Sequence, residues 1–259
     1  MTDLLAADLH RILWRPLTRA LVAISITVIA AAGVIVFLHS RAKHPFNTLT
    51  GLHSGLGDAA TPLALAGFIL GASLLGADYT SRALTTLLMW EPRRPQMLAS
   101  RATACAVVTA GSSLAALAVL AVALLPAALA HGTGPTPTGA WYLSMAGLAV
   151  RCALLAAAAS VIGMSCAAIG RSTTAALAGV GVYLLLVERA TMGVAPSIGR
   201  WLFVADAMSW IAVTSHTKIA GPGGQANGHT VLTAGLLLLA GVVAIHALAA
   251  TVLKHRDIT

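Results

Sequence analysis

The sequence predicts an all-α, polytopic membrane protein with six transmembrane helices. Hydrophobic residues make up 58% of the 259 residues and charged residues 9%, which is more apolar surface than one soluble core can bury. The apolar residues form six continuous runs, and the charges cluster between them. About 20 helical residues cross a hydrocarbon core of about 30 Å, so each run is long enough to span. A β-barrel would instead show short alternating strands, so we expect helices.

The predicted spans follow one another along a single transmembrane domain that covers residues 1–259. The first run is too long for a secretory signal, and no small-x-small cleavage pattern follows it, so we expect a retained first helix. The third and fourth runs exceed the hydrocarbon thickness, which permits tilt or extension beyond the lipid. No internal repeat is visible. The six spans are residues 20–38, 60–76, 102–130, 141–169, 174–191 and 231–253.

Residues 1–19, which precede the first span, contain a predicted amphipathic helix over 3–15. Apolar side chains recur at helical spacing on one face and charged side chains occupy the other, and Pro16 then interrupts the pattern. We expect this helix to lie in the inner membrane interface, with contact to a partner protein as the alternative. The apolar face consists of Leu5, Leu9, Ile12 and Leu13, and the charged face of Asp8, Arg11 and Arg15.

Two longer segments lie between spans on the side opposite the termini. Residues 40–59 contain Pro45 and several glycines, so we expect an irregular loop. Residues 192–230 precede the last span and begin with a half-apolar stretch, 198–213, that contains two tryptophans. This stretch is too short and polar to span, so we expect it to lie in the outer interface or to re-enter the membrane partway. The remainder is a glycine-rich loop.

The distribution of basic residues predicts the orientation. Six spans place both termini on one side, where ten arginines and lysines fall, against five on the other side. The positive-inside rule therefore predicts cytoplasmic termini and a cytoplasmic loop at 77–101. The heavy use of Ala, and of Arg over Lys, is typical of a high-GC bacterium, so the bacterial plasma membrane is the expected location. The net charge of +8 then reflects contact with the anionic inner leaflet of the lipid bilayer, and no nucleic-acid partner is expected.

The sequence contains no recognisable nucleotide-binding or metal-binding motif. A phosphate-binding loop requires Gly-x-x-x-x-Gly-Lys-Ser/Thr, and none of Lys43, Lys218 and Lys254 stands in that context. The nine histidines form no i, i+4 pair and join no carboxylate cluster, which disfavours a metal site. We therefore expect no enzyme activity and no cofactor bound by this chain. The three cysteines fall within spans and are expected to be buried structural thiols: Cys105, Cys152 and Cys166.

The loop between the second and third spans carries the most informative motif, GADYTSRALTTLLMWEPRRPQMLASRATA. An acidic–aromatic pair is followed by a Leu-rich turn, a proline and several arginines. This resembles the membrane subunits, or permeases, of type-2 ABC exporters, in which an acidic–aromatic pair, a Leu-rich turn and Pro-x-x-Arg precede the third helix. Arg82-Ala83 stands where that family usually has Gly-Thr. The matching residues are Asp78, Tyr79, Thr86, Leu87, Leu88, Pro92 and Arg101.

The resemblance implies a fold, partners and a site. In that family the loop carries a coupling helix that docks on a separate ATPase subunit, which binds ATP and Mg. Two permease subunits and two ATPase subunits would then export a hydrophobic or amphiphilic substrate, such as a drug, antibiotic, peptide or lipid. An ordinary juxtamembrane loop that binds anionic lipid is the alternative. The implied ATPase-contact residues are Asp78, Tyr79, Arg82, Leu87, Leu88, Trp90, Glu91, Pro92, Arg93 and Arg94.

Two charged residues in or near the spans are candidates for a substrate path or for intramembrane pairing. Arg151 lies well inside the fourth predicted span, where an unpaired cation costs at least about 2.5–3.5 kcal/mol. It is expected to snorkel outward, to pair, with Glu188 as the candidate partner, or to contact substrate. Glu188 lies near the outer end of the fifth span and could be simply interfacial. We expect Arg151 to face a subunit interface or an aqueous cavity.

Two other classes of membrane protein are alternatives. A secondary transporter needs intramembrane acidic residues or broken helices, and no carboxylate is expected near the membrane centre. An intramembrane serine protease would use a serine and a histidine in hydrogen-bond reach, for which Ser165 and His246 are the candidates. The usual rhomboid first-loop Trp-Arg pair is missing, and the residues that flank His246 fit poorly. We expect Ser165 to be a packing residue and His246 a hydrogen-bonding residue at a helix interface.

Overall fold

The computed structural model describes residues 2–42, 46–80, 94–133, 138–199, 201–211 and 230–255. Within these ranges the regular secondary structure is helical apart from two two-residue strands, β1 (Phe46–Asn47) and β2 (Gly132–Thr133), which pair in parallel. The helices are α1 Thr2–Leu13, α2 Pro16–Ala42, α3 Thr48–Asp58, α4 Ala60–Thr80, α6 Arg94–His131, α7 Gly139–Gly170, α8 Thr173–Val182, the π-helix η1 Tyr183–Glu188, α9 Arg189–Val194, α10 Pro196–Gly199, α11 Phe203–Ile211 and α12 Val231–His255.

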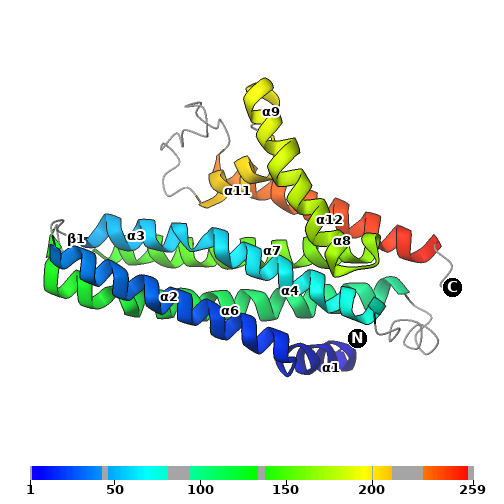
Figure 1. Ribbon diagram of the computed structural model, residues 1–259, viewed down its shortest axis with the longest axis horizontal. Helices are drawn as coiled ribbons and strands as arrows, with labels where there is room; N and C mark the ends of the chain where they lie inside the picture. Colours follow the sequence, from blue (N-terminus) through cyan, green and yellow to red (C-terminus); the bar gives the residue numbers. More distant parts are fainter. Residues whose placement is uncertain are drawn as a thin grey trace.

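The predicted all-helical class is confirmed, and six helices of the described ranges are long and apolar enough to cross a membrane. Five predicted spans lie within one of them; the third, 102–130, continues past Pro126, where the apolar stretch ends, but stays within α6. The fifth consists of α8, η1 and the start of α9. The predicted amphipathic helix is present as α1, which ends before the turn at Trp14 and Arg15. In Figure 1 the ends of α1 and α12 lie at the same end of the bundle as the end of α4 and the start of α6.

The expectation of an irregular loop at 40–59 is wrong for most of that segment. Helix α3 occupies Thr48–Asp58, and the hydrogen bond from Ala59 N to Gly55 O, 3.2 Å long, leads the backbone into α4. Leu52 and Leu56 are one turn apart and are both buried in the core. Burial of this apolar face outweighs the low helix propensity of the glycines, so the second membrane-length helix begins at Gly51.

The centre of the bundle is the pair α4 and α7. In the most apolar part of each of these two spans, 67% of the residues are buried inside the molecule. The corresponding share is 11% for the spans that contain α2 and α8. The two backbones approach so closely that a Cβ added at Gly71 would overlap the carbonyl of Ser160, and one added at Gly163 would overlap the carbonyl of Phe68. Small residues permit this close approach of membrane helices.

The remaining helices pack around this pair (Figure 1). Helix α6 packs on α7, α2 packs on α6, and α12 packs on both α7 and α11. Helices α8, η1 and α9 form one continuous stretch that leaves the bundle at a steep angle (Figure 1). An added Cβ at Gly179 or Gly181 of this stretch would meet nothing within 4 Å, so much of its surface faces away from the described chain.

Candidate functional site

A buried carboxylate joins three helices at the end of the bundle that holds α1. Asp78 lies in the last turn of α4 and is only 3% exposed. Arg11 of α1 donates from Nη2 to Asp78 Oδ1 over 2.8 Å, and Arg101 of α6 donates from Nη1 to Asp78 Oδ2. A carboxylate at a helix C-terminus is disfavoured by the helix dipole, so the two guanidinium groups supply the compensation.

A second group of contacts extends this cluster toward α1. Ser100 of α6 donates from Oγ to Asp8 Oδ2 over 2.9 Å, and Arg101 Nε lies 3.9 Å from Asp8 Oδ1. Arg15, just after α1, donates from Nη1 to the carbonyl of Leu74 over 3.4 Å. Burial lowers the pKa of Arg15, and the nearby carboxylate of Asp78 opposes that shift. We call this cluster the Asp78 junction; its members are Asp8, Arg11, Arg15, Asp78, Ser100 and Arg101.

The Asp78 junction gives the charged face of α1 a partner within the chain. Ile12 is buried at 3% exposure against Leu70 and Cys105, whereas Leu13, which the sequence assigned to the apolar face, is 55% exposed. The sequence reasoning identified these charges on α1 and Asp78 on α4 separately. The sequence contains no pattern that pairs Asp78 with the charged face of α1, because the two lie far apart in the chain.

The predicted ATPase-contact residues lie partly outside the described residues. Asp78 belongs to the junction, and Tyr79 donates from its hydroxyl to the carbonyl of Ala168 on α7 over 3.3 Å. Arg94 begins α6, and only its backbone is described. The other predicted contacts lie outside the described residues: Arg82, Leu87, Leu88, Trp90, Glu91, Pro92 and Arg93. The two ends of the loop are therefore fixed by α4 and α6, which the junction joins.

Arg151 and Glu188 contact opposite ends of helix α11. Arg151 donates from Nη1 to the carbonyl of Trp210 over 3.3 Å, and Trp210 Nε1 donates to the carbonyl of Arg151 over 3.0 Å. Glu188, 3% exposed, accepts at Oε1 from the backbone N–H of Val204 over 2.8 Å. These contacts connect both candidate residues to the same short helix. A cation at the C-terminus and an anion at the N-terminus of α11 both complement its dipole.

Asp206 is a buried acidic residue that no sequence pattern predicts. It lies on α11 at 5% exposure and is close enough to Glu188 for the two carboxylates to interact electrostatically. Asp206 belongs to the half-apolar segment 198–213, for which the sequence predicts either an interfacial or a partly re-entrant position and gives no signal for a buried acidic residue. Helix α11, which forms most of the described part of 198–213, packs against α12 and α7.

A large apolar groove separates the α4–α7 pair from the departing helix α8 and from α11. Its volume is about 620 Å³, and the side chains of Phe68, Ile162, Val180, Tyr183, Phe203 and Met208 contribute to its lining. None of the residues that line it carries a formal charge. Such a surface favours an apolar occupant, because a buried charge without a partner is costly.

Ser165 and His246 do lie within hydrogen-bond reach, with 3.3 Å between Ser165 Oγ and His246 Nδ1. However, Ser165 is fully buried between α7 and α12, and its hydroxyl already donates to the carbonyl of Val161 over 2.8 Å. A serine nucleophile needs its proton directed to the histidine and access to substrate. The contact therefore fits a hydrogen bond between two membrane helices.

The three cysteines are free thiols, and among the described residues no group of three or more His, Cys, Asp or Glu could hold a metal ion. Within the described residues, the Asp78 junction and the apolar groove are the features relevant to a function. Comparison with known proteins adds no identity, since neither a scan of protein-family models nor a search of curated proteins gives a match.

Proposed function

We propose that this chain is the permease subunit of a bacterial type-2 ABC exporter. The observation that carries the proposal is the Asp78 junction, which joins α1, α4 and α6 where the 77–101 loop leaves and re-enters the bundle. A partner that pushes on this loop moves three helices together, because the ion pairs of Asp78 with Arg11 and Arg101 prevent the loop ends from shifting independently. That is the mechanical property a coupling loop requires.

The apolar groove provides the second part of the proposal. A hydrophobic or amphiphilic substrate enters it from the membrane, with α8 and α11 on one side and the α4–α7 pair on the other. A second permease subunit completes the pathway beside the exposed surface of α8 and η1. Two ATPase subunits, which bind ATP and Mg, close beneath the cytoplasmic loops and reshape the groove.

The proposal is tested with the permease and its ATPase subunit in proteoliposomes. Leu88→Asp, or Arg93→Glu together with Arg94→Glu, is expected to abolish substrate-stimulated ATP hydrolysis or to release the ATPase subunit, while membrane insertion is retained. Ile198→Asp serves as the matched control, because Ile198 is 59% exposed on α10, in the segment expected on the other side of the membrane. Cross-linking that joins the ATPase to 192–230 instead of 77–101 would refute both the topology and the coupling role.

A secondary transporter is the second candidate, and the buried carboxylates of Glu188 and Asp206 favour it. Ion-coupled transport requires such groups within the membrane region. The two candidates differ in energy source. Inside-out vesicles that accumulate a lipophilic dye with Mg-ATP alone support the exporter, whereas accumulation driven by a pH gradient without ATP supports the secondary transporter.

A further inference from the structure

The turn between α1 and α2 presents apolar side chains outward. Helix α1 ends at Leu13 and α2 begins at Pro16, so Trp14 and Arg15 form the turn. Trp14 is 62% exposed, and Leu13 and Leu17 on either side of the turn are exposed as well. Tryptophan is enriched where a membrane-length helix meets the lipid headgroups, and α2 is such a helix. We therefore expect this turn to face the headgroup region.

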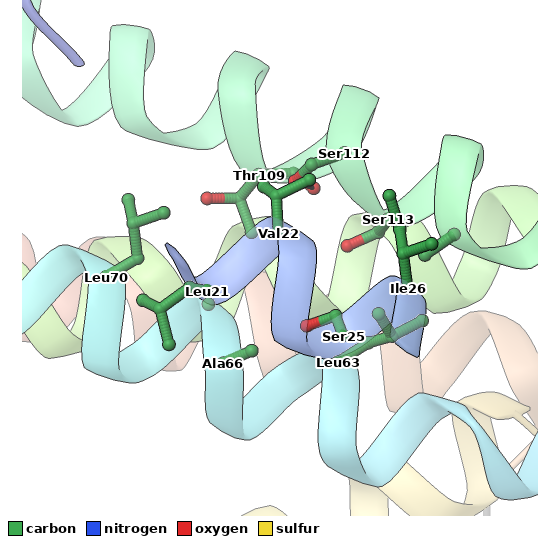
Figure 2. A pocket seen from close by; sticks show the side chains of 12 residues that line it. Leu21, Val22, Ser25, Ile26, Leu63, Ala66, Leu70, Thr109, Ser112 and Ser113 are labelled. Carbon is green, nitrogen blue, oxygen red and sulfur yellow. Dashed lines mark hydrogen bonds between the residues drawn. The ribbon is translucent and has the colours of Figure 1, made fainter. Parts of the chain in front are cut away.

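Both helices that flank the turn are held by the bundle. Ile12 of α1 is 3% exposed and Thr18 of α2 is 4% exposed. Figure 2 shows the next turns of α2, where Leu21, Val22 and Ile26 line a small pocket between α2, α4 and α6. The turn is therefore presented on a backbone that is fixed on both sides, which lowers the entropy cost of binding a partner.

The Asp78 junction, which adjoins the turn, contains three arginines but two aspartates. Arg15 is close enough to Arg11 and Arg101 for their positive charges to repel its own. Asp78 attracts Arg15, but it also accepts hydrogen bonds from the other two arginines. The members of the junction thus leave an excess of positive charge beside the turn.

Arg19 adds a further positive charge on the other side of the turn. It lies one helical turn after Arg15, to whose carbonyl its backbone N–H donates over 3.2 Å. The Arg19 guanidinium lies over the ring of Trp14, with 4.5 Å between Cζ and the ring centroid. Within the described residues, neither Arg15 nor Arg19 forms an ion pair with a carboxylate. An anion at the turn would offset both charges.

We propose that this turn binds the phosphate of an anionic phospholipid, with Arg15 and Arg19 as the donors. A guanidinium presents a planar fork of N–H groups that matches phosphate oxygens. A lipid is favoured over an acidic protein segment, because the exposed side chains of Leu13, Trp14 and Leu17 adjoin the arginines and lead into a membrane-length helix. The site requires only that the turn faces the membrane interface, so it does not depend on the exporter proposal.

Native mass spectrometry of the full-length chain in neutral detergent, with phosphatidylglycerol and phosphatidylcholine added in separate titrations, tests the proposal. The wild type is expected to bind phosphatidylglycerol more tightly. Arg19→Gln should weaken that binding about fivefold, the effect of one basic residue at an anionic lipid surface, and leave phosphatidylcholine binding unchanged. Arg19→Lys keeps the charge and should restore the preference. Equal affinity of the wild type for the two lipids would overturn the site.

Two controls separate this site from a general effect of charge. Lys254→Gln removes one exposed positive charge from α12, at the same end of the bundle, and should change phosphatidylglycerol affinity by less than about twofold. A loss as large as that of Arg19→Gln would show that only the net charge matters and would overturn the proposal. Displacement of phosphatidylglycerol by inorganic phosphate would also overturn it, because the turn would then bind a free anion and not a lipid.

Discussion

The Asp78 junction and the contacts at α11 use buried charge in different ways. At the junction, Asp78 binds two arginines from two other helices, so the charges neutralise one another. At α11, Glu188 and Arg151 bind the backbone at opposite ends of one nine-residue helix, so each charge is balanced by a helix dipole. The first arrangement joins three helices through side chains, and the second holds one short helix by its termini.

This difference predicts different responses to perturbation. Removing one member of a buried ion pair leaves a charge without a partner, which is strongly destabilising. Removing a charge from a helix terminus loses only a partial compensation, because the backbone group can still bond to another acceptor or donor. The junction is therefore expected to be lost as a whole when one member is removed. Helix α11 is expected to lose only part of its stability with each contact that is removed.

The largest expected effect is that of Asp78→Asn. The change leaves Arg101, whose side chain is 9% exposed, without its full counter-charge, and the free energy of unfolding should fall by about 3–5 kcal/mol. Thermal or denaturant unfolding in detergent measures the loss. Asp58→Asn, at the end of α3, is the control and should change stability by less than about 0.5 kcal/mol. Equal effects of the two variants would show that the junction does not hold the helices together.

An intermediate effect is expected for Arg151→Leu. The variant loses the bond to the carbonyl of Trp210, and hydrogen bonds of charged groups contribute about 1.5–3 kcal/mol. Amide hydrogen exchange should increase over Phe203–Ile211 while exchange in α4 stays unchanged, and transport or assembly should be impaired with insertion intact. The exposed Arg189 provides the control as Arg189→Leu. Faster exchange across the whole bundle would contradict a local role for Arg151.

The smallest effect is expected for Glu188→Gln. Glutamine retains an oxygen that can accept from Val204 N, so the variant removes only the charge at the N-terminus of α11, a loss of about 0.3–1 kcal/mol. Glu188→Ala removes the acceptor as well and should cost more. The hydrogen-exchange rate of the Val204 amide, measured in the wild type, Glu188→Gln and Glu188→Ala, compares these losses. A Glu188→Gln variant as unstable as Asp78→Asn would erase the distinction between the two regions.

The sequence predicts the helices of this protein better than it predicts their contacts. The six spans follow from continuous apolar runs, which depend on local composition alone. The junction instead joins residues 67 and 92 positions apart, and no local pattern records such pairs. Helix α3 was missed because its glycines indicate a loop until the burial of Leu52 and Leu56 is known. Glu188 and Arg151 were identified as unusual charges, but their shared partner α11 could not be found from spacing.

The close contact of α4 with α7 has a consequence for how the chain is assembled in the membrane. Gly71 of α4 packs against the backbone of Ser160, so this contact cannot form until α7, which begins at Gly139, has been synthesised. At about 5–20 residues per second, that delay lasts several seconds. The delay before Asp78 gains its partner is shorter, because Arg101 follows Asp78 by only 23 residues. We therefore expect the second and third predicted spans to pair through Asp78 and Arg101 before α7 is added to the core.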